Sequence, residues 1–137
     1  MSPAQEIHEG GCLCGAIRYR AAGAPLRINH CHCRMCLKAT GAAIVTWATF
    51  PRDHVTFTRG APTIRRSSEI AVRGFCAACG SALLWQADAV SDMIDLTVGT
   101  LDEPGRVRPQ EHLWTESAVG WLHIEDGLPR YPRSRPA

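Results

Sequence analysis

The chain has 137 residues, of which 45% are apolar, and its formal net charge is +2. A chain of this length folds as one domain and buries roughly two-thirds of the surface that it exposes when unfolded. We therefore expect a single domain over residues 1–137, with a core from about 10 to 132 and a flexible, basic and proline-rich tail at 133–137. No apolar run approaches the ~18 residues of a membrane span, and acidic and basic residues are interspersed, so we expect neither a membrane nor a nucleic acid as partner.

The sequence predicts a mostly β domain. Apolar segments recur at short intervals and are separated by glycine, proline and aspartate. In chain order, the predicted strands span 16–21, 26–31, 43–50, 54–58, 70–75, 82–86 and 93–98. A single helical turn is predicted at 34–40 and a short irregular segment at 111–118, since no stretch shows the long 3.6-residue apolar period of an amphipathic helix.

Seven cysteines form three tight clusters. They are Cys12 and Cys14; Cys31, Cys33 and Cys36; and Cys76 and Cys79. Two cysteines one or two residues apart cannot easily form a relaxed disulfide with each other, but a tight turn can direct both thiolates to one metal ion. The odd count also argues against a fully paired disulfide framework. The spacing therefore predicts metal binding.

The number of cysteines favours two kinds of metal site. A structural zinc ion takes four protein ligands, whereas a catalytic zinc ion takes three and keeps one position open. The first and last clusters are pairs, each followed by a glycine that lets the backbone turn under a metal, so we expect them to form a closed site and the triplet an open one. Two alternatives stay open. The last two cysteines of the triplet could form a zinc ribbon with Cys76 and Cys79, or the thiolates could hold an iron–sulfur cluster.

The N-terminal segment favours a cytoplasmic protein. Residues 1–10 include Glu6, His8 and Glu9 and have no apolar stretch of the kind that a signal peptide contains. In the reducing cytoplasm, clustered cysteines bind metals or take part in catalysis rather than form disulfides.

Several motifs together resemble a known enzyme family. They are Gly10-Gly-Cys-Leu-Cys-Gly-Ala-Ile-Arg-Tyr19, Cys31-His-Cys-Arg-Met-Cys36, Thr40-Gly41-Ala42, Phe75-Cys-Ala-Ala-Cys-Gly-Ser81, Gly99-Thr-Leu-Asp-Glu-Pro104 and the closing set His112, Trp121, Pro129 and Tyr131. With these motifs the sequence resembles the glutathione-dependent formaldehyde-activating enzymes, or S-(hydroxymethyl)glutathione synthases, a family that includes centromere protein V. The resemblance runs from about residue 10 to 132, and the cysteine spacing is its most specific part.

The resemblance implies a β-tent fold of small antiparallel sheets and two zinc ions per chain. The family's structural zinc ligands correspond to Cys12, Cys14, Cys76 and Cys79. Its catalytic zinc ligands correspond to Cys31, Cys33 and Cys36. The implied activity is that of a carbon–sulfur lyase acting in reverse, in which glutathione, as co-substrate, adds to formaldehyde.

Thiol chemistry is also favoured by the triplet itself. Three cysteinates leave a Zn²⁺ site with a net charge of about −1, so its bound water is polarised less than on a zinc ion held by neutral histidines. A soft ion with an open position suits a fourth thiol, which can then attack a small aldehyde held beside it. Arg34 and Trp47 are the candidate contacts for a glutathione-like ligand.

The alternative function is a non-catalytic one. Formaldehyde reacts with thiols unaided, so a second hypothesis is that the protein carries glutathione or formaldehyde. A third hypothesis is a zinc-binding interaction module. Nucleobase deamination is excluded, since it needs a His-x-Glu motif upstream of Pro-Cys-x-x-Cys. Here His123-Ile-Glu125 lies downstream of every cysteine, and Phe75 precedes Cys76.

Two histidines flank the first cysteine of the triplet. Neighbouring side chains on an extended strand point to opposite faces, so His30 and His32 are predicted to face solvent or to support the site, rather than to act as bases for a nucleophilic Cys31.

Overall fold

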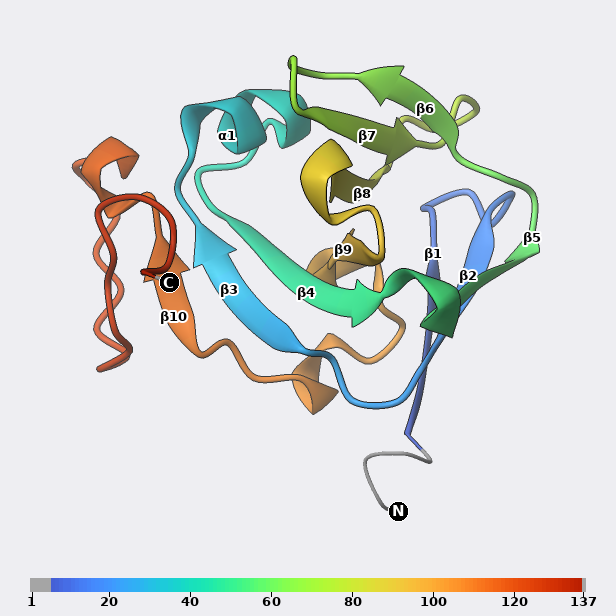
Figure 1. Ribbon diagram of the computed structural model, residues 1–137, viewed down its shortest axis with the longest axis horizontal. Helices are drawn as coiled ribbons and strands as arrows, with labels where there is room; N and C mark the ends of the chain where they lie inside the picture. Colours follow the sequence, from blue (N-terminus) through green and yellow to red (C-terminus); the bar gives the residue numbers. More distant parts are fainter. Residues whose placement is uncertain (1–5, 137) are drawn as a thin grey trace.

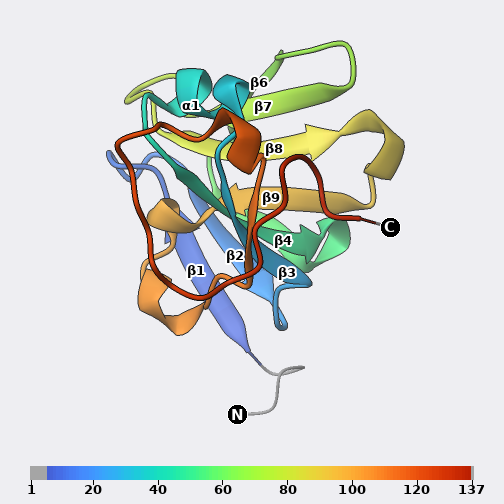
Figure 2. The same ribbon diagram turned by 90° about the vertical axis from the view of Figure 1, so that its left-hand side faces the viewer.

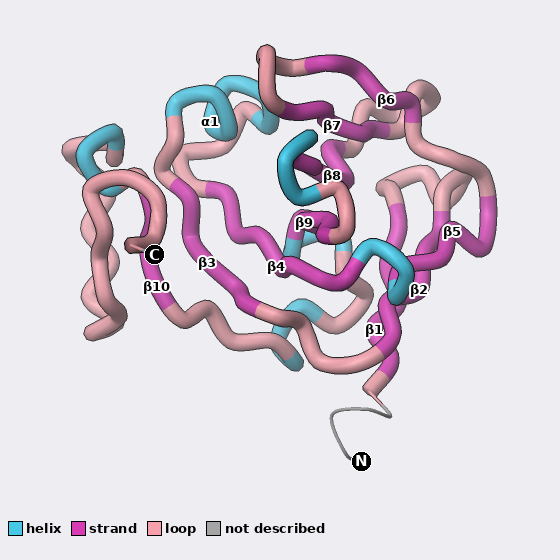
Figure 3. The backbone as a smooth tube through the Cα atoms, viewed as in Figure 1, coloured by secondary structure: helices cyan, strands magenta, loops and turns pink. Residues whose placement is uncertain are grey.

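The computed structural model describes residues 6–136 and contains two β-sheets (Figure 1). The strands are β1 (Ile7–Gly11), β2 (Arg18–Ala22), β3 (Arg27–Cys31), β4 (Val45–Pro51), β5 (Val55–Arg59), β6 (Thr63–Arg66), β7 (Ala71–Phe75), β8 (Ala82–Ala87), β9 (Met93–Thr97) and β10 (Glu111–Leu113). Helix α1 spans Arg34–Thr40, and single 3₁₀ turns span Arg52–His54, Asp88–Val90, Val98–Thr100, Pro104–Arg106 and Thr115–Ser117. Figure 3 shows how little of the chain is helical, which confirms the expected mostly β class. None of the helices within residues 6–136 is long and apolar enough to cross a membrane.

The two sheets differ in size. The smaller has the strand order β1-β2-β5, and the larger has the order β10-β3-β4-β9-β8-β7-β6. Neighbouring strands are antiparallel, except that β10 pairs with β3 in parallel. The larger sheet is strongly curved, with β10 at one edge and β6 at the other (Figure 1).

Each predicted strand corresponds to one observed strand, with ends that agree to within two residues. The predicted helical turn at 34–40 is α1. Three strands were not predicted, namely β1, β6 and β10, the last of which lies inside the segment that was expected to be irregular.

Strand β4 separates two apolar clusters. Ala48 and Phe50 are fully buried and belong to the main core, to which both sheets contribute. Val45 and Trp47 belong to a second apolar cluster that also contains two cysteines of the triplet. Because side chains alternate along a strand, the triplet packs on the face of the larger sheet that points away from the main core.

After the 3₁₀ turn at Thr115–Ser117, the chain forms an irregular segment that returns alongside β10 (Figure 2). Its end is held by ion pairs: Arg133 Nε donates to Glu116 Oε1 at 2.9 Å, and Arg135 Nε donates to Glu111 Oε2 at 2.7 Å. Glu111 is only 4% exposed, so its pair with Arg135 is more than a surface contact. Arg133 and Arg135 of the expected tail are thus in contact with the domain, whereas Ala137 lies outside the described residues.

Candidate active site and metal centre

Two glycine turns bring four cysteines together. This four-cysteine cluster consists of Cys12, Cys14, Cys76 and Cys79, whose sulfur atoms all lie within 4.8 Å of one another. The Sγ atom of Cys14 is 3.6 Å from that of Cys12 and 3.8 Å from that of Cys76. Gly15 and Gly80 adopt φ angles of 82° and 81°, a region that glycine enters without steric cost. Their N–H groups donate to the carbonyls of Cys12 and Cys76, which closes each turn under the thiols as the sequence predicted.

Hydrogen-bond donors around the four-cysteine cluster favour thiolates. The Ile17 N–H donates to Cys12 Sγ at 3.2 Å. Hydrogen bonds from the side chain and backbone of Ser81 lower the pKa of Cys79 to about 5. The Leu13 N–H donates to Ser81 Oγ at 2.9 Å and so links the two turns. Metal-bound cysteines must be deprotonated, and the distances and donors of this cluster therefore fit a closed site for a thiophilic ion.

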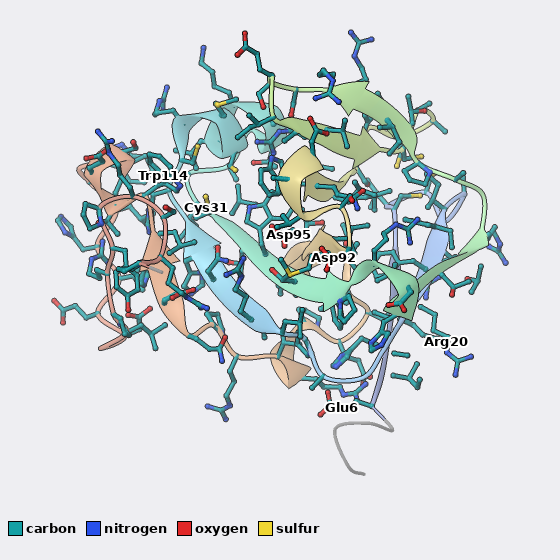
Figure 4. All side chains as sticks on the ribbon, in the orientation of Figure 1. Glu6, Arg20, Cys31, Asp92, Asp95 and Trp114 are labelled. Carbon is teal, nitrogen blue, oxygen red and sulfur yellow. The ribbon has the colours of Figure 1, made fainter. Side chains whose placement is uncertain are left out.

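The cysteine triplet lies where β3 ends and α1 begins. Cys31 is the last residue of β3 (Figure 4), Cys33 directly precedes α1, and Cys36 lies in the first turn of the helix. Cys31 and Cys36 are buried, and Cys33 is half-buried. Within residues 6–136, the groups of potential ligands whose atoms all lie within 4.8 Å do not include the triplet, so at least one pair of its sulfur atoms is further apart.

A cation from a distant strand reaches the triplet. Arg73, on β7, donates from Nη2 to Cys36 Sγ at 3.4 Å. Hydrogen bonding with Cys31, together with Arg73 and the Trp47 indole, lowers the pKa of Cys36 to about 6 against the opposing effect of burial. The hydrogen bond with Cys36, together with burial, raises the pKa of Cys31. At neutral pH, Cys36 is therefore the thiolate of this pair.

Aromatic side chains surround the triplet. Trp47 is 4% exposed and belongs to the same apolar cluster, while Trp85 and Trp114 pack against that cluster. Trp114 has a φ of 58°, a left-handed conformation that costs a bulky residue of order 1–3 kcal/mol and is found mostly at functional sites. The other predicted ligand contact, Arg34, is exposed on α1.

The strand register places Arg73 in a row with other side chains. Arg73 on β7 pairs with Trp85 on β8, Trp85 pairs with Asp95 on β9, and Asp95 pairs with Thr49 on β4. Thr49 Oγ1 donates to Asp95 Oδ1 at 2.5 Å, and burial raises the pKa of Asp95. The row therefore runs across one face of the larger sheet, from Arg73 beside the triplet to the half-buried Asp95 and its partner Thr49.

An open cleft of about 470 Å³ lies beside the end of α1. Its lining includes Thr40 and Ala42, which follow the triplet, and Gly99 and Thr100, which lie in a turn after β9. These residues belong to two of the motifs that resemble the family, and Val45 connects the cleft to the apolar cluster around the triplet. Its volume lies within the range of small-molecule sites.

A second group of metal-ligand type consists of His30, His112 and Asp126, which we call the His/Asp group. The His112 Nε2–H donates to Asp126 Oδ2 at 2.7 Å, and His32 Nε2 lies 2.9 Å from His112 Nδ1. Burial lowers the pKa of His32 to about 4 and also lowers that of His30, so both rings are neutral at pH 7.

The two histidines that flank Cys31 have different surroundings. His30 pairs with Thr46 and points to the face opposite Cys31, as predicted. His32 is 2% exposed, so the part of the prediction that allowed it to face solvent is wrong. Its side-chain hydrogen bond goes to His112 of the His/Asp group, and a supporting role at the triplet stays a prediction. No pattern in the sequence indicated Arg73 or Asp126 as site residues.

Comparisons with known proteins point to one family. The chain matches the family described as glutathione-dependent formaldehyde-activating enzyme over residues 7–117. A Halomonas elongata protein, named provisionally as a glutathione-dependent formaldehyde-activating enzyme, is 30% identical over 129 residues, which cover 85% of this chain and 80% of that protein. The crystal structure of a Rhodobacter sphaeroides protein shares the fold with a TM-score of 0.56 at 20% identity, covering 90% of this chain and 98% of the other. The expected resemblance and fold are thus confirmed, and the chain belongs to the glutathione-dependent formaldehyde-activating enzyme family.

Proposed function

We propose that this protein is a zinc-dependent enzyme of the carbon–sulfur lyase type that activates glutathione, or a similar thiol, for addition to formaldehyde or another small aldehyde. In this proposal the four-cysteine cluster holds a structural zinc ion, and Cys31, Cys33 and Cys36 hold a catalytic one. Family membership supports the reaction class. The observation that carries the proposal is the group of buried thiols that shares a cluster with Trp47 and accepts a hydrogen bond from Arg73.

The donor chemistry of the triplet suits a zinc ion. Thiolates are soft ligands, and Cys36 already has a pKa of about 6 in the absence of metal. A zinc ion bound by three cysteinates supplies a soft, open position at which an incoming thiol loses its proton.

The surrounding residues would orient the reactants and control charge. The Arg73 guanidinium lies beside Cys36 and offsets the repulsion between the thiolates of the triplet and an approaching thiolate. The rings of Trp47, Trp85 and Trp114 limit the access of water, which strengthens that electrostatic effect. The cleft beside α1 has room for the peptide part of the thiol, and the exposed guanidinium of Arg34 is available for one of its carboxylates.

Glutathione binding tests this function. Binding should release a proton, because the thiol loses one, and it should strengthen as the pH rises toward the pKa of the free thiol. S-methylglutathione, which has the same peptide but no ionisable thiol, should bind much more weakly. Calorimetry in two buffers of different ionisation enthalpy counts the proton, and NMR exchange between formaldehyde and its glutathione adduct measures turnover.

Two outcomes would contradict the proposed enzymatic function. Equal binding of glutathione and its S-methyl form would exclude activation of the thiol. Tight, proton-releasing binding with an exchange rate that stays at the uncatalysed value would instead favour a carrier of glutathione or formaldehyde.

The two cysteine sites should also differ in affinity for zinc, because four thiolates hold the ion more strongly than three. A mild chelator should remove one zinc ion first and leave the circular dichroism spectrum unchanged, and a stronger chelator should then unfold the chain. Elemental analysis before and after each step measures the count. Iron in place of zinc, or loss of the fold with the first ion, would contradict the assignment of the two sites.

A further inference from the structure

We propose that the His/Asp group is a further binding site for a divalent transition-metal ion, distinct from both cysteine sites. One ring nitrogen each of His30 and His112 and a carboxylate oxygen of Asp126 all lie within 4.8 Å of one another. The two rings are 4.9 Å apart between centroids and are tilted by 35°, so they lie close together without stacking flat. Two imidazoles and one carboxylate form a ligand set that zinc and its neighbours among the divalent metals bind.

The strand register separates this group from the cysteine triplet. His112 on β10 pairs with His30 on β3, and the same register pairs Leu113 with Cys31. Since paired residues share a face and successive residues alternate, both histidines lie on one side of the sheet and Cys31 lies on the other. An ion at the His/Asp group would therefore not share ligands with an ion at the triplet.

One nitrogen of each histidine ring is hydrogen-bonded to a residue outside the group. His30 Nδ1 is 2.7 Å from Thr46 Oγ1, and His112 Nδ1 is 2.9 Å from His32 Nε2. Among the described residues, no hydrogen-bond partner is found for His30 Nε2. Metal-binding histidines usually have their other nitrogen fixed in this way, because the bond sets the orientation of the ring.

The third ligand comes from the irregular segment that returns alongside β10. The backbone of this segment is bonded to His112, whose N–H donates to Pro129 at 2.8 Å and whose carbonyl accepts from Tyr131 at 2.9 Å. His112 is fully buried, whereas Asp126 is exposed, so an ion can enter from the side of the carboxylate (Figure 2 shows the segment). Bound there, it would join the segment to β3 and β10, and its remaining positions would be open.

Cobalt and zinc titrations test this site. In protein whose cysteine sites are filled with zinc, added Co²⁺ should bind at one further site per chain. The spectrum should lack the intense near-ultraviolet charge-transfer band that cobalt shows with thiolates. Zinc in place of cobalt should shift the ring nitrogen signals of His30 and His112 in long-range ¹H–¹⁵N NMR spectra. None of these readouts involves glutathione, so their failure is distinguishable from failure of the proposed enzyme.

Matched variants locate the ion. Asp126→Asn keeps the shape of the side chain but removes its charge, and it should weaken cobalt binding at least about 10-fold, as should His30→Gln. Glu125→Gln removes the neighbouring exposed carboxylate and should bind cobalt like the wild type. The proposal is overturned if the wild type binds no further ion, if the histidine signals do not move, if Asp126→Asn binds as well as Glu125→Gln, or if the thiolate band grows with the added cobalt.

Discussion

Cys79→Ser should yield unfolded or insoluble protein, whereas Cys33→Ser should fold and lose only its second metal ion. Structural zinc binding contributes ~10–16 kcal/mol, which is comparable with the entire stability of a typical domain, ~5–15 kcal/mol. Cys79 belongs to the four-cysteine cluster, which joins the turn after β1 to the turn after β7. Loss of that ion would disconnect segments from both sheets. Soluble yield, near-ultraviolet circular dichroism and elemental zinc content measure the effect.

The two substitutions are matched controls for each other. Each replaces one half-buried thiol by a hydroxyl, so differences in side-chain volume and exposure do not explain a difference in folding. If Cys79→Ser melts like the wild type while Cys33→Ser unfolds, the structural and catalytic roles have been assigned the wrong way round.

The strands that the sequence predicted share an apolar core face, and those that it missed do not. Every residue of β6 is exposed, so no alternation marks this edge strand. Strand β10 has only three residues and pairs in parallel with β3, a partner about 80 residues earlier, a distance that local patterns do not report. Strand β1 ends in Gly10 and Gly11, which reduce its strand propensity.

The four-cysteine cluster was accessible to sequence reasoning because each of its two pairs is held by a local turn. Gly15 and Gly80 are visible in the sequence, and they adopt the positive φ angles that the turns require. The neighbours of the triplet come from elsewhere. Arg73 lies on β7, which three strands separate from β3 in a curved sheet, and no residue pattern near position 73 indicates its contact with Cys36.

Local sequence patterns also did not predict the His/Asp group. His30 is adjacent to Cys31 in the sequence, and the alternation of side chains correctly places it on the other face. Its companions, His112 and Asp126, are brought to it by the parallel pairing of β10 and by a segment without regular structure. Such long-range placement depends on the whole topology.

Substitution of Gly10 by alanine should destabilise the protein by about 1–3 kcal/mol, the usual cost of an overpacked core. A Cβ atom at this position would lie 2.4 Å from the Thr100 carbonyl oxygen and 2.5 Å from the Tyr19 hydroxyl. Neither neighbour moves easily, because Tyr19 is 1% exposed and its hydroxyl is hydrogen-bonded to Thr100 Oγ1 at 2.9 Å. Gly10 also bridges to Leu101, so a shift of β1 would break backbone pairing.

Gly105→Ala is the matched control, since a Cβ atom there meets nothing within 4 Å and the residue is exposed in a 3₁₀ turn. Its free energy of unfolding should stay within about 0.5 kcal/mol of the wild type. Urea unfolding must be followed at one fixed zinc concentration, because metal that binds only the folded state adds to the apparent stability. Equal unfolding midpoints for the two variants would mean that β1 can move away from Thr100 without cost. Neither packing nor pairing would then explain the first glycine of the Gly10-Gly-Cys motif. A loss of stability for Gly10→Ala alone would show that this glycine allows β1 to approach the turn after β9, directly beside the first pair of cysteines.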